Sequence, residues 1–124
     1  MNYESLMESA KKASLNSYSP YSDYKVGAAV LTKNKNVYMG TNVENASYGL
    51  TICAERSALC NAVSSGEKEF TALAVYNEDK NISPCGACRE FIKEFGLDIE
   101  IVYYLKGEVV IKKISELLPD AFTI

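Results

Sequence analysis

The sequence lacks three features that would point to a polymer or a membrane as its partner: an excess of basic residues, a long apolar run and an export signal. Its 13 Lys and Arg residues are outnumbered by 16 Asp and Glu residues, so the formal charge is -3. A protein with no basic field does not gather a phosphate backbone, which argues against nucleic acid. No stretch approaches the ~20 apolar residues that cross a membrane, and no basic-then-apolar signal begins the chain. We therefore expect a cytoplasmic protein with neither nucleic acid nor membrane as partner.

The composition that is present fits one compact domain. The chain has 124 residues, of which 48% are hydrophobic and 23% charged, as in ordinary globular proteins. Repeats, low-complexity tracts and Pro- or Gly-rich linkers are absent, so we expect a single domain over residues 1–124. A chain this short leaves much of its surface open, and association with copies of itself would bury apolar area.

Apolar periodicity predicts that helices and strands alternate along the chain. Helices are predicted at Asn2–Asn16, at Thr51–Val63, after a loop within Ser83–Phe95 where Gly96 closes the helix, and at Ser115–Leu118. Strands are predicted at Val26–Thr32, Val37–Thr41, Phe70–Tyr76, Glu100–Leu105 and Glu108–Lys113. The expected fold class is α/β: a mixed five-stranded sheet covered by helices in a three-layer sandwich.

Three of the four cysteines lie in two short motifs, CAER (residues 53–56) and PCGACR (residues 84–89), and each motif opens a predicted helix. Without an export signal, such cysteines indicate metal binding or catalysis rather than disulfides. Residues two apart point about 200° away from each other in mid-helix, so Cys53 and Glu55 can serve one point only at the first turn. Cys85 and Cys88 share one face of their helix, and Pro84 suits a helix start because its missing N–H would be unpaired anyway.

The two helix starts predict a catalytic zinc site. Unpaired N–H groups and the positive end of the helix dipole stabilise thiolates, and three sulfur ligands favour zinc. We expect one Zn2+ per subunit, bound by Cys53, Cys85 and Cys88, with the fourth tetrahedral position free for water. Bound zinc lowers the pKa of such a water to roughly 7, which makes it a nucleophile at neutral pH.

Glu55 and Arg56 have distinct expected roles beside that ion. Glu55, which is not a ligand, would take the proton of the water and return it to N3 of a cytosine ring, and would later protonate the departing amine. In this mechanism zinc-bound hydroxide attacks C4 and ammonia leaves. Three thiolates weaken the ion as a Lewis acid, and Arg56 would offset this by donating hydrogen bonds to one or two sulfurs.

The same residues also allow less specific interpretations. Cys60 could complete a structural four-cysteine site, but seven helical residues separate it from Cys53 by about 10 Å, so we expect a buried inert thiol. The CGAC segment alone could be a redox dithiol, and the upstream CAE motif is what favours metal. Arg89 could pair with a carboxylate or cover a sulfur, and the sequence does not choose between these.

Nearly the whole chain resembles the small homotetrameric cytidine deaminases. Four segments carry the resemblance in order: YSPYSDYKVGAAV (residues 18–30), NVENASYGLTICAERSAL (residues 42–59), SPCGACR (residues 83–89) and LLPDAF (residues 117–122). The resemblance implies a cytidine deaminase of pyrimidine salvage, a zinc hydrolase that converts cytidine and deoxycytidine to uridine and deoxyuridine. It also implies a homotetramer with shared active sites, in which Tyr48 and Phe122 reach a neighbouring subunit's site.

The resemblance further implies a set of substrate contacts within each subunit. Asn42 and Glu44 would hydrogen-bond the sugar hydroxyls, Tyr24 would pack against the nucleoside, and backbone groups around Ala54 and Ser83 would contact the base. Two positions depart from the family: it usually has Phe where this chain has Tyr24, and Asp120 within LLPDAF is a smaller change that leaves Phe122 intact. The added hydroxyl of Tyr24 needs a hydrogen-bond partner.

Two other functions compete with the nucleoside deaminase. A non-catalytic, zinc-stabilised binding or assembly module would need the cysteines but not Glu55. A deaminase of another cytosine compound, such as an antibiotic, a free base or a nucleotide, would keep the chemistry and change the substrate. Against the nucleotide, Glu44 would repel a phosphate, and no basic cluster near the motifs compensates for it.

Overall fold

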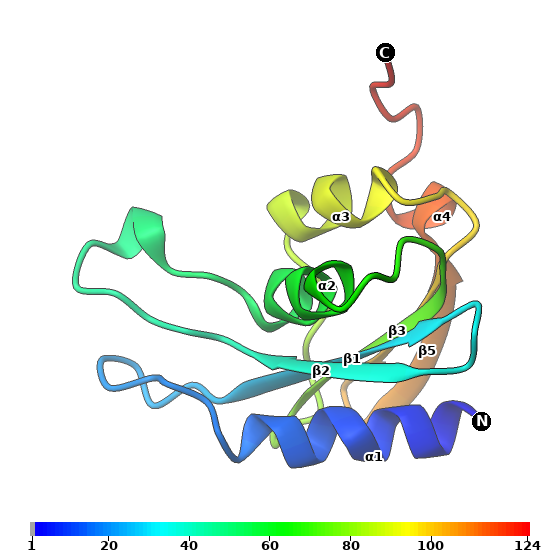
Figure 1. The fold of residues 1–124 in the computed structure, drawn as a ribbon. Helices are drawn as coiled ribbons and strands as arrows, with labels where there is room; N and C mark the ends of the chain where they lie inside the picture. Colours follow the sequence, from blue (N-terminus) through cyan, green and yellow to red (C-terminus); the bar gives the residue numbers. More distant parts are fainter. Residues whose placement is uncertain (1) are drawn as a thin grey trace.

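The computed structural model describes residues 2–124, which form one mixed sheet flanked by helices (Figure 1). The helical elements are α1 (Tyr3–Ser14), a 3-10 turn η1 (Tyr48–Leu50), α2 (Ala54–Ser64), α3 (Gly86–Lys93) and α4 (Ile114–Leu117). The strands are β1 (Val26–Thr32), β2 (Val37–Thr41), β3 (Phe70–Asn77), β4 (Glu100–Leu105) and β5 (Glu108–Lys113). Their order in the sheet is β2-β1-β3-β4-β5, and only the β3–β4 pair is parallel.

The elements stack in three layers. Helix α1 covers one face of the sheet, where Leu6, Met7 and Ala10 pack against apolar side chains of β1, β3 and β4. Helices α2, α3 and α4 lie on the opposite face (Figure 1), where Leu59, Ile92 and other buried residues form the larger core. The predicted α/β fold, with its mixed five-stranded sheet between helical layers, is confirmed.

Gly27 and Gly40 let both helical layers approach the sheet closely. A Cβ atom on Gly40 of β2 would lie 2.2 Å from the backbone nitrogen of Ala58 in α2, and one on Gly27 of β1 would lie 1.9 Å from the carbonyl oxygen of Ala10 in α1. Real Cβ contacts are never that short, so neither position accepts a larger residue without backbone movement. This close packing fixes the height of α2 above the sheet.

The start of α2 differs from the prediction in a way that matters for the site. Thr51–Val63 was the expected helix, but the observed helix begins at Ala54, so the first three of those residues are not helical. Ile52 instead exchanges two backbone hydrogen bonds with Val43, at 2.9 and 3.0 Å. Cys53 is therefore the extended N-cap residue of α2, with φ -73° and ψ 154°.

Two segments extend away from the body of the molecule in Figure 1. One is the loop that carries η1, in which Tyr48 is 74% exposed, and the other is the C-terminal segment beyond α4, in which Phe122 is 73% exposed. Both side chains are large and apolar and stand in solvent in the single chain. Among the described residues, no helix has the length and apolar character to cross a membrane.

Candidate active site

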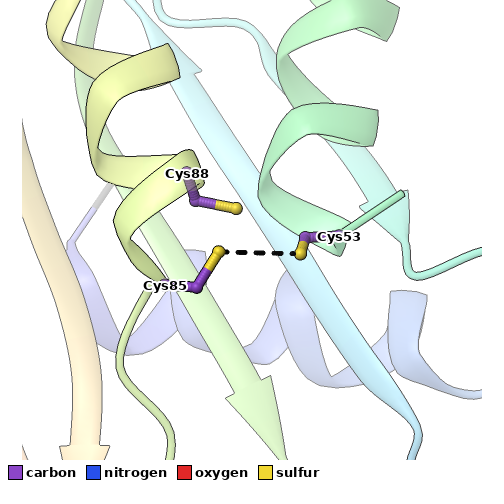
Figure 2. A group of neighbouring side chains, drawn as sticks. All are labelled: Cys53, Cys85 and Cys88. Atoms are coloured by element: carbon purple, nitrogen blue, oxygen red, sulfur yellow. Dashed lines mark hydrogen bonds between the residues drawn. The ribbon is translucent and has the colours of Figure 1, made fainter. Parts of the chain in front are cut away.

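Three cysteine sulfurs converge where α2 and α3 begin. Cys53 is the N-cap of α2 and Cys85 the N-cap of α3, while Cys88 lies in the first turn of α3. All three Sγ atoms lie within 4.8 Å of one another, and the Cys53 and Cys85 sulfurs are 3.9 Å apart (Figure 2). The predicted convergence of these three sulfurs is confirmed, and Figure 2 shows them pointing toward a common centre between the two helix starts.

The sulfur cluster fits a tetrahedral zinc ion. Zinc–sulfur bonds of about 2.3 Å place neighbouring sulfurs of a tetrahedron about 3.8 Å apart, close to the Cys53–Cys85 separation. Without a cation the three thiols cannot all ionise. The hydrogen bond from Cys88, together with Arg56, lowers the pKa of Cys53 to about 5, while the same hydrogen bond and burial raise the pKa of Cys88. A divalent cation removes this opposition because it neutralises the thiolates it binds.

Glu55 is the second residue of α2 and is 3% exposed. Burial raises the pKa of its carboxyl to about 7, with a further contribution from the nearby Cys53. Its carboxylate is not part of the metal-ligand cluster formed within residues 2–124. The site therefore holds, beside three sulfurs, a buried carboxyl that gains and loses a proton near neutral pH.

Arg56 follows Glu55 and turns its guanidinium toward the sulfurs. Its Nη2 donates to Cys53 Sγ at 3.4 Å, and the Cys53 thiolate raises the pKa of the guanidinium. The Nε–H of Arg56 is buried and has no hydrogen-bond partner within the described chain. Arg56 thus occupies the place expected for a cation that withdraws charge from a sulfur.

A cavity of about 370 Å³ opens beside the sulfur cluster. Every substrate contact predicted within one chain lines it, together with two of the cysteines and Glu55: Tyr24, Asn42, Glu44, Ala54, Ser83, Cys53, Cys85 and Glu55. Sequence reasoning missed four more lining residues, Val26, Thr51, Ile52 and Ile82. A cavity of similar size beside α1 contains none of the predicted site residues.

Asn42 has one hydrogen-bonding position left for a ligand. Its Oδ1 accepts from the Ser17 hydroxyl and from the backbone N–H of Val26, and its Nδ2 donates to the carbonyl oxygen of Tyr24 at 2.7 Å. An amide side chain offers two acceptor lone pairs and two donors, so only one N–H of Asn42 stays unused.

Glu44 offers the complementary position. Its Oε1 accepts from the backbone N–H groups of Tyr21 and Ser22, at 3.0 and 3.2 Å, and its Oε2 accepts from the Ser22 hydroxyl. These bonds, the hydroxyl first among them, lower the pKa of Glu44, so the group is ionised at neutral pH. A carboxylate accepts about four hydrogen bonds, and one acceptor position on Oε2 is left.

The hydroxyl of Tyr24, which the usual Phe lacks, has a hydrogen-bond partner. Asn77, at the end of β3, donates from Nδ2 to the Tyr24 hydroxyl at 2.9 Å. Burial, and then the charge of Asp79, raise the pKa of this phenol. Sequence reasoning did not single out Asn77, because nothing in its local pattern distinguishes it from the last residue of a buried strand.

Tyr48 and Phe122 do not reach the cavity of their own chain. The Tyr48 ring stands edge-on to the ring of Tyr21, with 6.3 Å between centroids, and lines no part of the cavity. The backbone at Phe122 is held by Lys93, whose Nζ donates to the Phe122 carbonyl oxygen at 2.5 Å. Both side chains are exposed in the single chain.

Two expectations for the remaining motif residues, those on Cys60 and Pro84, need correction, and Arg89 has partners that neither of its two alternatives named. Cys60 is exposed rather than buried, because the buried face of α2 is formed by its neighbours Ala58 and Leu59, and it lies outside the sulfur cluster. Within residues 2–124, Arg89 bonds no carboxylate and no sulfur: it donates to the carbonyl oxygens of Pro84 at 2.8 Å and Leu117 at 2.9 Å. Pro84 precedes the N-cap of α3 instead of opening the helix.

Comparisons with known proteins agree with this geometry. Residues 1–106 match the family model described as "Cytidine and deoxycytidylate deaminase zinc-binding region". A cytidine deaminase from Sporosarcina psychrophila is 44% identical, over 99% of this chain and 93% of the relative, and one from Halalkalibacterium halodurans is 45% identical, over 99% and 96%. The crystal structure of cytidine deaminase from Burkholderia pseudomallei matches with a TM-score of 0.93 and 47% identity, over 98% of this chain and all of the other.

Proposed function

This chain belongs to the cytidine and deoxycytidylate deaminase family, and from that premise we propose that it is a zinc-dependent hydrolase that deaminates cytidine and deoxycytidine to uridine and deoxyuridine. The proposal treats residues 1–124 as a single deaminase domain. One observation carries it: three sulfurs within 4.8 Å of one another share a cavity of about 370 Å³ with the buried carboxyl of Glu55.

The metal and the acid have separate tasks in this reaction. Cys53, Cys85 and Cys88 would hold zinc, which when bound would lower the pKa of water enough for attack on carbon at neutral pH. Glu55 would accept one proton from water and deliver it to N3 of the cytosine ring. Once the water oxygen has bonded to C4, Glu55 would transfer the second proton of that oxygen to the 4-amino group, which leaves as ammonia. The positive charge of Arg56 lies against Cys53 and withdraws electron density from its sulfur, so the three sulfurs would weaken zinc less as a Lewis acid.

Asn42 and Glu44 would together select a substrate that carries a sugar hydroxyl. The spare N–H of Asn42 donates to it and the spare acceptor position of Glu44 accepts from it, and a hydroxyl is both acceptor and donor. A substrate without this hydroxyl would leave both groups unpaired, which is why free cytosine should be a poor substrate. The charge of Glu44 disfavours a nucleoside monophosphate in the same way.

The buried position of Glu55 favours the enzyme over a non-catalytic zinc module. A carboxyl that is 3% exposed costs stability when it ionises, and a module that only holds zinc gains nothing in return. In the deaminase the same group has a task in every step. Stability is therefore given up at the position where catalysis requires a proton carrier.

We also propose a homotetramer with shared active sites and a cytoplasmic location. Tyr48 and Phe122 are exposed on two projecting segments of the single chain, as expected of side chains that complete a neighbouring site. The Cys53 and Cys85 sulfurs, 3.9 Å apart, need reducing conditions to remain available as ligands, and the cytoplasm supplies them.

The experiment that tests the function follows loss of ultraviolet absorbance with cytidine, deoxycytidine, cytosine and cytidine monophosphate, with zinc content measured on the same samples. We expect turnover of the two nucleosides only, at one zinc per chain. A protein that carries one zinc per chain and leaves cytidine unchanged would be the non-catalytic module. Preferential turnover of cytosine or of the monophosphate would reassign the substrate.

Shared sites are tested by mixing two inactive variants. Glu55→Gln removes the proton carrier of a subunit's own site, and Phe122→Ala removes the side chain that it offers to a neighbour. Subunits exchanged between the two variants would form some sites with both groups intact, so mixing should restore part of the activity. Activity that equals the sum of the separate variants would argue that each chain completes its own site.

A further inference from the structure

Asn77 is a buried amide whose orientation is determined by its surroundings. It is the last residue of β3, faces Val26 across the β1–β3 pair and is 2% exposed. Its Oδ1 accepts from the backbone N–H of Asn81 at 3.2 Å. Because a backbone N–H can only donate, the Oδ1 must face Asn81, and Nδ2 must face the Tyr24 hydroxyl, 2.9 Å away.

This hydrogen bond closes a frame around Tyr24. At the backbone, the Tyr24 carbonyl oxygen accepts from Asn42 at 2.7 Å, and at the ring tip the hydroxyl accepts from Asn77. The segment between α1 and β1 that carries Tyr24 has no helix or strand of its own, apart from an isolated bridge at Tyr18. Tyr24 is 44% exposed and lines the proposed nucleoside cavity, so packing alone does not hold its ring.

We propose that Asn77 is a positioning residue of the nucleoside pocket, which acts by holding the Tyr24 ring in place as the wall of that pocket through a hydrogen bond to its hydroxyl. This inference rests on the proposed function and extends it to Asn77, a residue that does not itself line the cavity. Tyr24 and Asn77 form a pair: a phenylalanine at position 24 would leave the buried amide without an acceptor, and an alanine at position 77 would leave the tyrosine without its anchor.

The effect of losing the anchor falls on substrate binding. A neutral hydrogen bond contributes enough to change an equilibrium constant about three- to tenfold. Glu55 and the three cysteines are not part of the Tyr24–Asn77 pair, so the groups of the chemical step are unchanged. Asn77→Ala should therefore raise KM for cytidine about three- to tenfold and change kcat less than twofold.

The test is a double-mutant cycle on zinc-loaded protein: wild type, Asn77→Ala, Tyr24→Phe and the double variant. In the Tyr24→Phe background there is no hydroxyl to hold, so Asn77→Ala should change KM less than twofold. Asn81→Ala keeps the backbone N–H that bonds Asn77 and removes the side-chain acceptor of the Lys106 N–H at the same turn, so it is the matched control and should leave KM within twofold of wild type. If Asn77→Ala does not fold, Asn77→Ser takes its place, because its short side chain does not reach Tyr24.

An equal rise of KM in both backgrounds would overturn the proposal, since Asn77 would then act only through the turn to Asn81. A loss confined to kcat would overturn it as well. Calorimetric binding of uridine, the expected product, which the enzyme does not turn over, distinguishes a failure of the proposed reaction from a failure of the proposed role of Asn77. If wild type binds uridine without deaminating cytidine, the proposed reaction fails, while the same cycle read in the dissociation constant for uridine still decides the role of Asn77.

Discussion

Replacing Glu55 with glutamine tests its proposed role as proton carrier without changing any other group of the site. Glutamine has the shape of the carboxyl but neither accepts nor delivers a proton at neutral pH. Proton transfer by a positioned side chain contributes about 10²- to 10⁴-fold to a rate, so kcat for cytidine should fall by that factor. Since Glu55 is not in the sulfur cluster, zinc content should stay at one ion per chain.

The same substitution should stabilise the zinc-free protein, and more so as the pH rises. Burial raises the pKa of Glu55 from 4.5 to about 7, so the unfolded chain releases this proton more readily than the folded one. Stability is then lost as pH rises from 4.5 to about 7 and is constant above that. At about 1.4 kcal/mol per pKa unit, Glu55→Gln gains about 1 kcal/mol at pH 5.5 and about 3 kcal/mol at pH 8.

Two assays check these numbers: steady-state kinetics by ultraviolet absorbance with zinc analysis, and urea unfolding of the zinc-free proteins at pH 5.5 and pH 8. A variant that keeps kcat within tenfold of wild type would show that Glu55 does not carry the proton. Loss of zinc would make Glu55 a ligand. A stability gain that does not grow with pH would contradict the burial of this carboxyl.

Two further substitutions probe the surroundings of the site. Arg56→Ala should keep most of the zinc but lose activity, because the Cys53 thiolate loses its donor at 3.4 Å; unchanged turnover would refute the role of Arg56. Gly40→Ala would place a Cβ atom 2.2 Å from the backbone of Ala58 and should lower the free energy of unfolding by about 3 kcal/mol or more. This loss would be seen as a fall of about 10 °C in Tm or as insoluble protein. An unchanged Tm would show that α2 is not held so close to the sheet.

Much of the fold follows from patterns within single segments. The hairpin β1–β2 and the pair β4–β5 have the predicted bounds, because each strand is a short apolar or alternating run closed by polar or glycine turns. The sulfur cluster was predictable for a related reason. Helix starts are marked in the sequence, and cysteines at two helix starts have few ways to be used together.

The differences arise from contacts between distant segments. Helix propensity extends α2 back to Thr51, but the bridge between Ile52 and Val43 holds those residues extended, and no local pattern signals it. Arg89 and Asn77 find partners 28 and 53 residues away, at Leu117 and Tyr24. Such pairings depend on how the layers stack, so a single sequence carries no direct sign of them.

Zinc content per chain, measured for wild type, Cys88→Ser and Cys60→Ser, tests the central claim most directly. Cys88 is buried in the cluster and Cys60 is an exposed thiol outside it, so the two variants make the same chemical change at different places. We expect one zinc per chain in wild type and in Cys60→Ser, and little or none in Cys88→Ser. Equal zinc in all three proteins would contradict a site built from Cys53, Cys85 and Cys88.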